Sequence, residues 1–138
     1  YELMYLPLFR KAIKVFGFIP VKRGSGKEEV KKVKALGTKH INKGRWIVIF
    51  PEGTRVKHKE TKRYGLSGAL LAVGTSSSIT PIAHNAGKYW GRRALKKESG
   101  TIVFSIGKTI SCRGKAYDEI NSEVKRWIDT EVSRLDNL

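Results

Sequence analysis

The sequence predicts an α/β domain with a largely parallel central β-sheet flanked by helices. Short runs of β-branched and aromatic residues alternate along the chain with longer stretches of helical periodicity, which is typical of strands joined by crossover helices. The run Trp-Ile-Val-Ile-Phe at 46–50 is apolar throughout, so it predicts a fully buried strand. At 138 residues the chain is long enough for one core and too short for two, which predicts a single domain over 1–138.

The first half is expected to contribute two helices and a short strand. Apolar residues at helical spacing predict a helix over 3–16, which either packs on the core or lies near anionic headgroups. A short strand is predicted at 18–21. Ser25 and Glu28 have the spacing of a capping box, so a second helix is expected to run from there to about residue 42.

Further elements follow the central strand. A basic loop over 55–63 leads to a helix of small residues at 67–77, and strands are expected at 79–83 and 101–106. Pro81 lacks an N–H, which places its strand at an edge or a bulge. The periodicity of residues 118–135 predicts a closing amphipathic helix.

The charge is strongly and unevenly positive. The formal net charge is +16, and residues 1–65 hold 17 Lys and Arg against 5 Asp and Glu. Such a chain is attracted to polyanions, so nucleic acid, an anionic bilayer and a phosphorylated small substrate all remain open as partners. The single cysteine, Cys112, excludes an intrachain disulfide.

The turn after the central strand concentrates polar chemistry. Pro51 and Gly53 are expected to end the strand, and Glu52, Thr54 and Arg55 follow within the same few residues. The guanidinium of Arg55 has the fork geometry that matches phosphate oxygens. The alternative is an ordinary polar turn whose charges are simply solvated.

This stretch, Phe-Pro-Glu-Gly-Thr-Arg at 50–55, resembles the third motif of the glycerolipid acyltransferases, specifically the bacterial 1-acyl-glycerol-3-phosphate acyltransferases. The resemblance implies that Arg55 binds the glycerol phosphate and that Glu52 orders the site around it. Gly53 and Thr54 match the motif as well.

Two further segments carry the same resemblance. The strand at 18–21 followed by Arg23 is similar to the second motif of the family, which implies an auxiliary phosphate contact for Arg23. The strand at 79–83 resembles the fourth motif, which implies that Pro81 shapes the acyl-binding region. The turn at 84–87, His-Asn-Ala-Gly, followed by Tyr-Trp at 89–90 is similar to bacterial members.

The family's His-x-x-x-x-Asp motif is absent from the sequence. Five residues after His40, His58 and His84 the chain has Arg45, Arg63 and Tyr89, none of which is a carboxylate. The resemblance places that motif N-terminal to residues 1–9, so we expect an N-terminally truncated domain that is inactive by itself. No catalytic residue and no metal ligand is predicted in the chain, and His84 is expected to be a hydrogen-bonded turn residue.

The resemblance implies acyl transfer from acyl-CoA or acyl-carrier protein to lysophosphatidic acid (1-acyl-glycerol-3-phosphate), giving phosphatidic acid. No cofactor beyond the acyl donor is expected. The expected location is the cytoplasmic face of a membrane, at an anionic surface, with a peripheral or N-terminally anchored attachment.

Two alternatives remain. The acceptor could be another glycerol phosphate or lysophospholipid. The chain could instead be a non-enzymatic nucleic-acid-binding module, which would need aromatic residues interleaved with cations on an exposed sheet face. Most aromatic residues fall where burial is expected, so no specific nucleic-acid partner is predicted.

Overall fold

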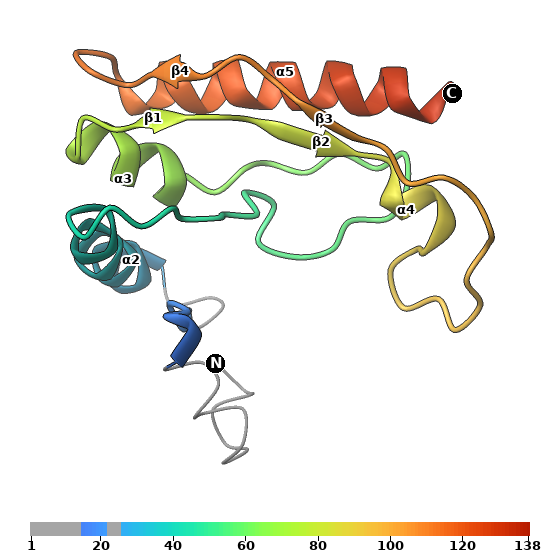
Figure 1. Ribbon diagram of the computed structural model, residues 1–138, viewed down its shortest axis with the longest axis horizontal. Coiled ribbons are helices and arrows are strands. Elements are labelled where there is room, and N and C mark those ends of the chain that lie inside the picture. Colours follow the sequence, from blue (N-terminus) through green and yellow to red (C-terminus); the bar gives the residue numbers. More distant parts are fainter. Residues whose placement is uncertain (1–14, 22–25) are drawn as a thin grey trace. The chain divides into compact units, whose positions relative to one another are not determined.

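The computed structural model describes residues 15–21 and 26–138 (Figure 1). Its contacts divide the chain into two compact units, Tyr1–Val48 and Ile49–Leu138, and each is described by itself. The predicted helix at 3–16 falls almost entirely outside the described residues, and Arg23 and the capping residue Ser25 lie outside them as well. The single domain over 1–138 stays a prediction.

In the first unit the dominant element is helix α2, Gly26–Ile41. Glu28 and Glu29 lie in its first turn and Lys39 in its last, an arrangement that complements the helix dipole. Val33 is buried on its inner face. Gly44 adopts a φ of +70° just beyond the helix, where a residue with a Cβ is disfavoured. The predicted second helix is confirmed.

The second unit consists of an antiparallel ribbon that packs on a long helix. Strands β1 (Ser78–Ile79) and β2 (Ile82–His84) run along one side of the ribbon, and β3 (Phe104–Ile106) and β4 (Ile110–Ser111) along the other. Helix α5, Tyr117–Asp136, lies lengthwise along the ribbon (Figure 1) and packs against β2 and against the short helix α3, Ser67–Gly74. The one-turn helix α4, Ala86–Tyr89, follows β2.

The core of this unit lies between α3, α5 and the ribbon. Its buried members are small or aliphatic side chains from all three: Ala69, Ala72, Cys112, Ile120 and Val124. Helix α3 is built of small residues, so it can approach α5 closely. Burial raises the pKa of the Cys112 thiol, and this cysteine therefore packs as a small apolar residue.

A β-bulge interrupts the ribbon at Pro81. Ile79 pairs with Ile110 and Ile82 pairs with Ile106, so Thr80 and Pro81 oppose the three residues 107–109. The Gly107 N–H donates to the Pro81 carbonyl at 2.9 Å, and the hydroxyls of Thr80 and Thr109 are 2.9 Å apart. Proline has no N–H to donate to the opposite strand, and at a bulge the ladder does not require that hydrogen bond. This confirms the position predicted for Pro81.

The predicted sheet differs from the observed one. Every strand pair among the described residues is antiparallel, so the chain mixes helices and strands but shows no parallel central sheet there. Residues 46–50 form no strand, and Trp46 is 91% exposed. A strand needs a neighbouring backbone to pair with, and none of the described residues pairs with this run. The predicted strand at 18–21 is absent for the same reason.

The remaining elements follow the predictions more closely. Helices α3 and α5 are confirmed, while the strand predicted at 101–106 shortens to β3. One face of the ribbon points away from α5 and exposes Ile82, Phe104 and Ile106, whereas Ala83 on the other face is buried. In the part of the chain that the structure describes, we find no helix with the length and apolarity that crossing a membrane requires.

Candidate functional site

The turn at 51–55 lies in the second unit and is held by its backbone. The Gly53 N–H donates to the Phe50 carbonyl at 3.0 Å, and the Gly65 N–H donates to the Pro51 carbonyl at 2.7 Å. Gly53 has a φ of +66°, a conformation that glycine adopts without steric cost. The turn predicted from Pro51 and Gly53 is therefore present, and the Pro51 carbonyl ties it to the segment before α3.

Glu52 faces inward from this turn. Its side chain is partly buried, and this burial raises the pKa of the carboxyl group. The negative charge of Asp129 on α5 raises it further, while the positive charges near it, which include Lys62 and Lys125, act in the opposite direction. Glu52 is thus partly buried and responds to charges on α5, so it is not a fully solvated surface charge.

Tyr64 completes the surroundings of Glu52. It is only 4% exposed, and the Lys125 ammonium lies 5.2 Å from the centre of its ring. Burial raises the pKa of the Tyr64 hydroxyl, and the charges of Asp129 and Glu52 raise it further. Lys125 also forms an ion pair with Asp129 one turn along α5. We refer to Glu52, Tyr64, Lys125 and Asp129 as the Glu52 cluster.

Sequence reasoning missed most of the Glu52 cluster. Lys125 and Asp129 were counted only as part of the closing helix, and Tyr64 follows a basic loop that gives no sign of burial. One available signal is the position of Tyr64, an aromatic residue three positions before a helix rich in small residues. Such a side chain can cover the space that small residues leave open.

Arg55 does not belong to the Glu52 cluster. Its side chain is exposed, and it forms no hydrogen bond or ion pair with any described residue. Thr54 beside it is half-buried. Glu52 is thus partly buried and Arg55 exposed on the same turn, and no described residue bonds to the guanidinium. Its distance from Arg23 is not defined, because Arg23 lies outside the described residues.

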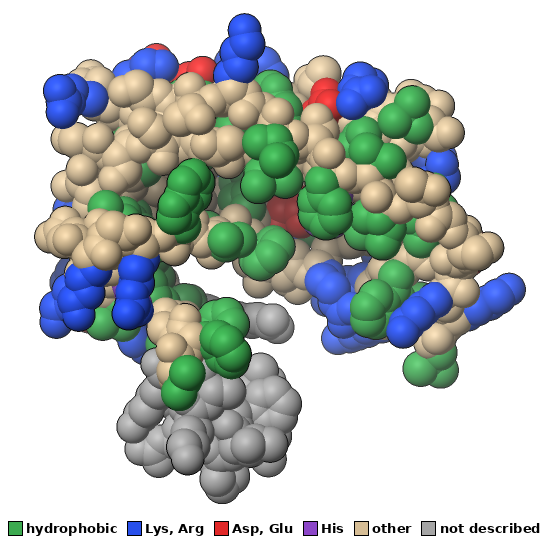
Figure 2. Space-filling view, viewed as in Figure 1, with side chains coloured by type: hydrophobic (Ala, Val, Ile, Leu, Met, Phe, Trp, Pro, Cys, Tyr) green, Lys and Arg blue, Asp and Glu red, His purple; other side chains and the backbone are tan. Residues whose placement is uncertain are grey.

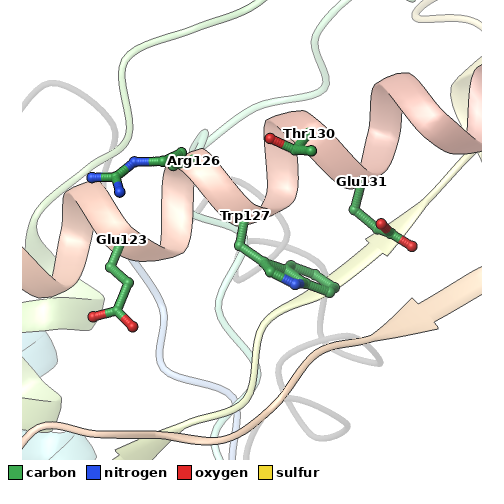
Figure 3. Close-up of a pocket in the computed structure, with 5 residues that line it drawn as sticks. All are labelled: Glu123, Arg126, Trp127, Thr130 and Glu131. Atoms are coloured by element: carbon green, nitrogen blue, oxygen red, sulfur yellow. The ribbon is translucent and has the colours of Figure 1, made fainter.

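A shallow hollow lies along α5, apart from the predicted site residues. Glu123, Arg126, Trp127, Thr130 and Glu131 line it (Figure 3). The Ser105 hydroxyl donates to Glu131 at 2.6 Å. The pKa of the Glu131 carboxyl group is lowered, mainly by its hydrogen bond with Arg134 and secondly by the one with Ser105. All five lining residues come from one helix, so the hollow is a surface feature rather than an enclosed site.

Pro81 is buried beside this helix. A Cβ placed on Gly107 would lie 2.7 Å from the Trp127 ring and 2.9 Å from the Pro81 ring, so these three residues pack tightly at the bulge. No described residue shows what an acyl chain would contact there. The acyl-region role of Pro81 stays a prediction.

The three histidines have separate partners. His84 Nδ1 accepts a hydrogen bond from the Ala86 N–H at 3.2 Å, which confirms the turn residue expected there. His58 Nε2 lies 2.9 Å from an Asp136 carboxylate oxygen at the end of α5, an ion-pair distance without a hydrogen bond. His40 lies at the end of α2, 3.4 Å from an Arg45 nitrogen. The His58–Asp136 contact spans most of the unit's sequence and was not foreseen.

Comparison with known families identifies the family of this chain. The family model described as Acyltransferase matches residues 1–85, a range that includes the turn at 51–55. The chain belongs to the acyltransferase family.

Individual relatives agree with this assignment. The chain is 33% identical over 137 residues to a 1-acyl-sn-glycerol-3-phosphate acyltransferase of Pseudomonas aeruginosa, covering 97% of this chain and 53% of that protein. It is 23% identical over 137 residues to a provisionally named 1-acyl-sn-glycerol-3-phosphate acyltransferase of Caenorhabditis elegans, covering 98% of this chain and 52% of that protein. The chain thus spans about half the length of these relatives. No solved structure matches it significantly.

Proposed function

We propose that the protein to which this chain belongs transfers an acyl group to lysophosphatidic acid and so forms phosphatidic acid. The observation that supports this most directly is the turn at 51–55: it lies within the region matched by the family, and it presents an exposed guanidinium at Arg55 that no described residue pairs with. The Pseudomonas relative carries the name of this activity.

Arg55 is the proposed ligand of the acceptor phosphate. A guanidinium donates two parallel hydrogen bonds to phosphate oxygens, which fixes both distance and orientation. Thr54 is an additional donor for the same anion, as are backbone N–H groups of the turn other than that of Gly53, which donates to Phe50. Arg23 is proposed as a second cation for this phosphate.

Glu52 is proposed to set the orientation of the turn. Its carboxyl group is partly buried, and the charges of Asp129 and Lys125 on α5 act on its pKa. Three residues later, Arg55 is exposed to solvent. In this proposal the two side chains have separate roles: Glu52 orients the turn and Arg55 binds the phosphate.

The acceptor hydroxyl must lose a proton as it attacks the acyl carbonyl, and a general base takes that proton. We assign this step to a His-x-x-x-x-Asp motif supplied by the longer protein, and to none of the three histidines of this chain. The acyl donor is proposed to be acyl-CoA or acyl-carrier protein. Both are anionic and are attracted by the net charge of +16.

The proposed location is the cytoplasmic face of a membrane, where the lipid acceptor and product reside. In the complete domain, the apolar run at 46–50 is proposed to join a largely parallel sheet once neighbouring strands are present. Its exposed side chains, Trp46, Val48 and Phe50, are the kind that such pairing would bury.

The test is an acyltransfer assay on the full-length gene product with three acceptors. Lysophosphatidic acid should be converted to phosphatidic acid, whereas lysophosphatidylcholine, whose phosphate is a diester, should be a poor acceptor. Preference for lysophosphatidylcholine or glycerol-3-phosphate would replace the proposed acceptor by another of the same family. If none of the three acceptors is acylated, the enzymatic function is rejected.

A further inference from the structure

The loop at 90–97, which follows α4, differs in charge from the rest of its half of the chain. It holds Arg92, Arg93, Lys96 and Lys97 and no carboxylate, whereas the other residues of 66–138 contain seven cations and seven carboxylates. The whole net charge of that half therefore lies on one loop. Figure 2 shows Lys and Arg side chains gathered beside apolar ones in the region below α4.

The same loop exposes large apolar side chains. Leu95 is 102% exposed and Trp90 is 52% exposed. The Lys97 ammonium lies 4.4 Å from the centre of the Trp90 ring, a cation–π contact that leaves one side of the indole available. The apolar surface of a fully exposed leucine is unfavourable in water, so moving this side chain into an apolar environment would lower the free energy.

The base of the loop is firmly held. Asn85 is only 3% exposed; its side-chain oxygen accepts from the Val103 N–H at 2.9 Å, and its amide donates to the Thr101 carbonyl at 3.4 Å. The Glu98 N–H donates to the Tyr89 carbonyl at 2.8 Å. The loop is thus a protrusion with a fixed base, and its exposed side chains are presented at a defined place.

We infer that the 90–97 loop is a docking site for an anionic bilayer surface. Lys and Arg are attracted to anionic headgroups, tryptophan favours the interface between headgroup and acyl chain, and leucine gains by entering the apolar layer. A nucleic acid would use the cations and the indole but offers no apolar layer for Leu95. This inference rests on the proposed function, because it names the surface through which the enzyme would reach a lipid acceptor.

The first experiment measures where Leu95 lies. Leu95→Cys in the 138-residue chain is labelled with an environment-sensitive fluorophore, because the native Cys112 is fully buried and is shielded from the reagent. Vesicles of phosphatidylcholine and phosphatidylglycerol should shift the emission to the blue, whereas Arg113→Cys, exposed elsewhere in the same unit, should give no shift. No shift at position 95, or an equal shift at both positions, would overturn the inference. A shift with a DNA duplex and none with vesicles would assign the loop to nucleic acid instead.

The second experiment measures affinity for the same vesicles. Removing two loop cations in Arg92→Ala/Lys96→Ala should weaken binding about 25-fold, at about 5-fold for each cation. The matched variant Lys108→Ala/Arg113→Ala removes equal charge from exposed positions outside the loop and should change binding less than about 3-fold. Equal losses in both variants would show generic attraction and reject the loop as the site.

These vesicles contain no lysophosphatidic acid, so the two proposals fail separately. Vesicle binding through the loop, together with no acyl transfer by the full-length gene product, would reject the proposed function and leave the docking site in place. Normal acyl transfer, together with no effect of the loop variants on vesicle binding, would support the proposed function and reject the docking site.

Discussion

Glu52 links the motif turn to the stability of the second unit. Its carboxyl pKa lies above the ordinary value of 4.5, chiefly because of burial. The folded state therefore binds the proton more tightly than the unfolded state does, and this contribution to stability is full below about pH 4.5 and is lost as the pH rises through the folded pKa. The residue proposed to orient Arg55 thus weakens the fold at neutral pH.

Replacing Glu52 by glutamine should raise stability at about pH 8 and leave it unchanged at about pH 4. The gain should stay below about 1 kcal/mol, because solvent screens the exposed part of the carboxylate. Thermal unfolding at the two pH values measures it, with Glu60→Gln on the exposed basic loop as the control. A loss of stability at the higher pH would show that the Glu52 charge is favourably paired.

Asn85 is the buried polar residue that connects the end of β2 to the strand opposite. Asn85→Ala should cost about 1–3 kcal/mol, because it removes a buried side chain that bonds to the Val103 N–H and to the Thr101 carbonyl. The control is Asn137→Ala, which removes an exposed hydrogen bond to the Ser133 carbonyl and should cost less than about 0.5 kcal/mol. Urea unfolding measures both; equal effects would mean that Asn85 does not hold the base of the 90–97 loop.

At the scale of the elements, the β-bulge fixes how the ribbon lies on α5. Gly107 lets the Trp127 ring approach the bulge closely, since a Cβ there would overlap the ring. Gly107→Ala should therefore destabilise the second unit by about 1–3 kcal/mol.

The matched control for Gly107 is Gly87 in α4, where an added Cβ meets nothing within 4 Å. Gly87→Ala should be neutral or stabilising by up to about 1 kcal/mol. Chemical unfolding of both variants tests the packing at the bulge. If Gly107→Ala were as stable as the parent chain, the tight contact between Trp127 and the ribbon would be wrong.

Elements with local determinants were predictable, and elements with distant partners were not. Helix α5 follows from the spacing of Ile120, Val124 and Leu135, and the bulge follows from the missing N–H of Pro81. The run at 46–50 carries every local mark of a strand, yet pairing depends on a neighbour that sequence periodicity cannot supply. The Glu52 cluster was hidden for the same reason, because Asp129 lies far along the chain from Glu52 and only the packing of α5 brings them together.

At the scale of the whole chain, the nonspecific attraction of polyanions by the charge of +16 must be distinguished from sequence-specific binding of nucleic acid. If the proposed function holds, binding to duplex DNA should be generic, with an affinity that falls steeply with salt and does not depend on sequence. A salt titration against two unrelated duplexes measures this. Tight binding to one duplex that persists at high salt would favour the nucleic-acid module over the enzyme.

The central claim is that Arg55 holds the acceptor phosphate, and steady-state kinetics of the full-length gene product tests it most directly. Arg55→Ala should raise KM for lysophosphatidic acid about 10- to 100-fold, as expected for losing charge-assisted hydrogen bonds worth about 1.5–3 kcal/mol. Arg113→Ala, which removes an exposed arginine elsewhere in the same unit, should leave KM unchanged. An unaltered KM in Arg55→Ala, or an equal rise in both variants, would contradict the claim.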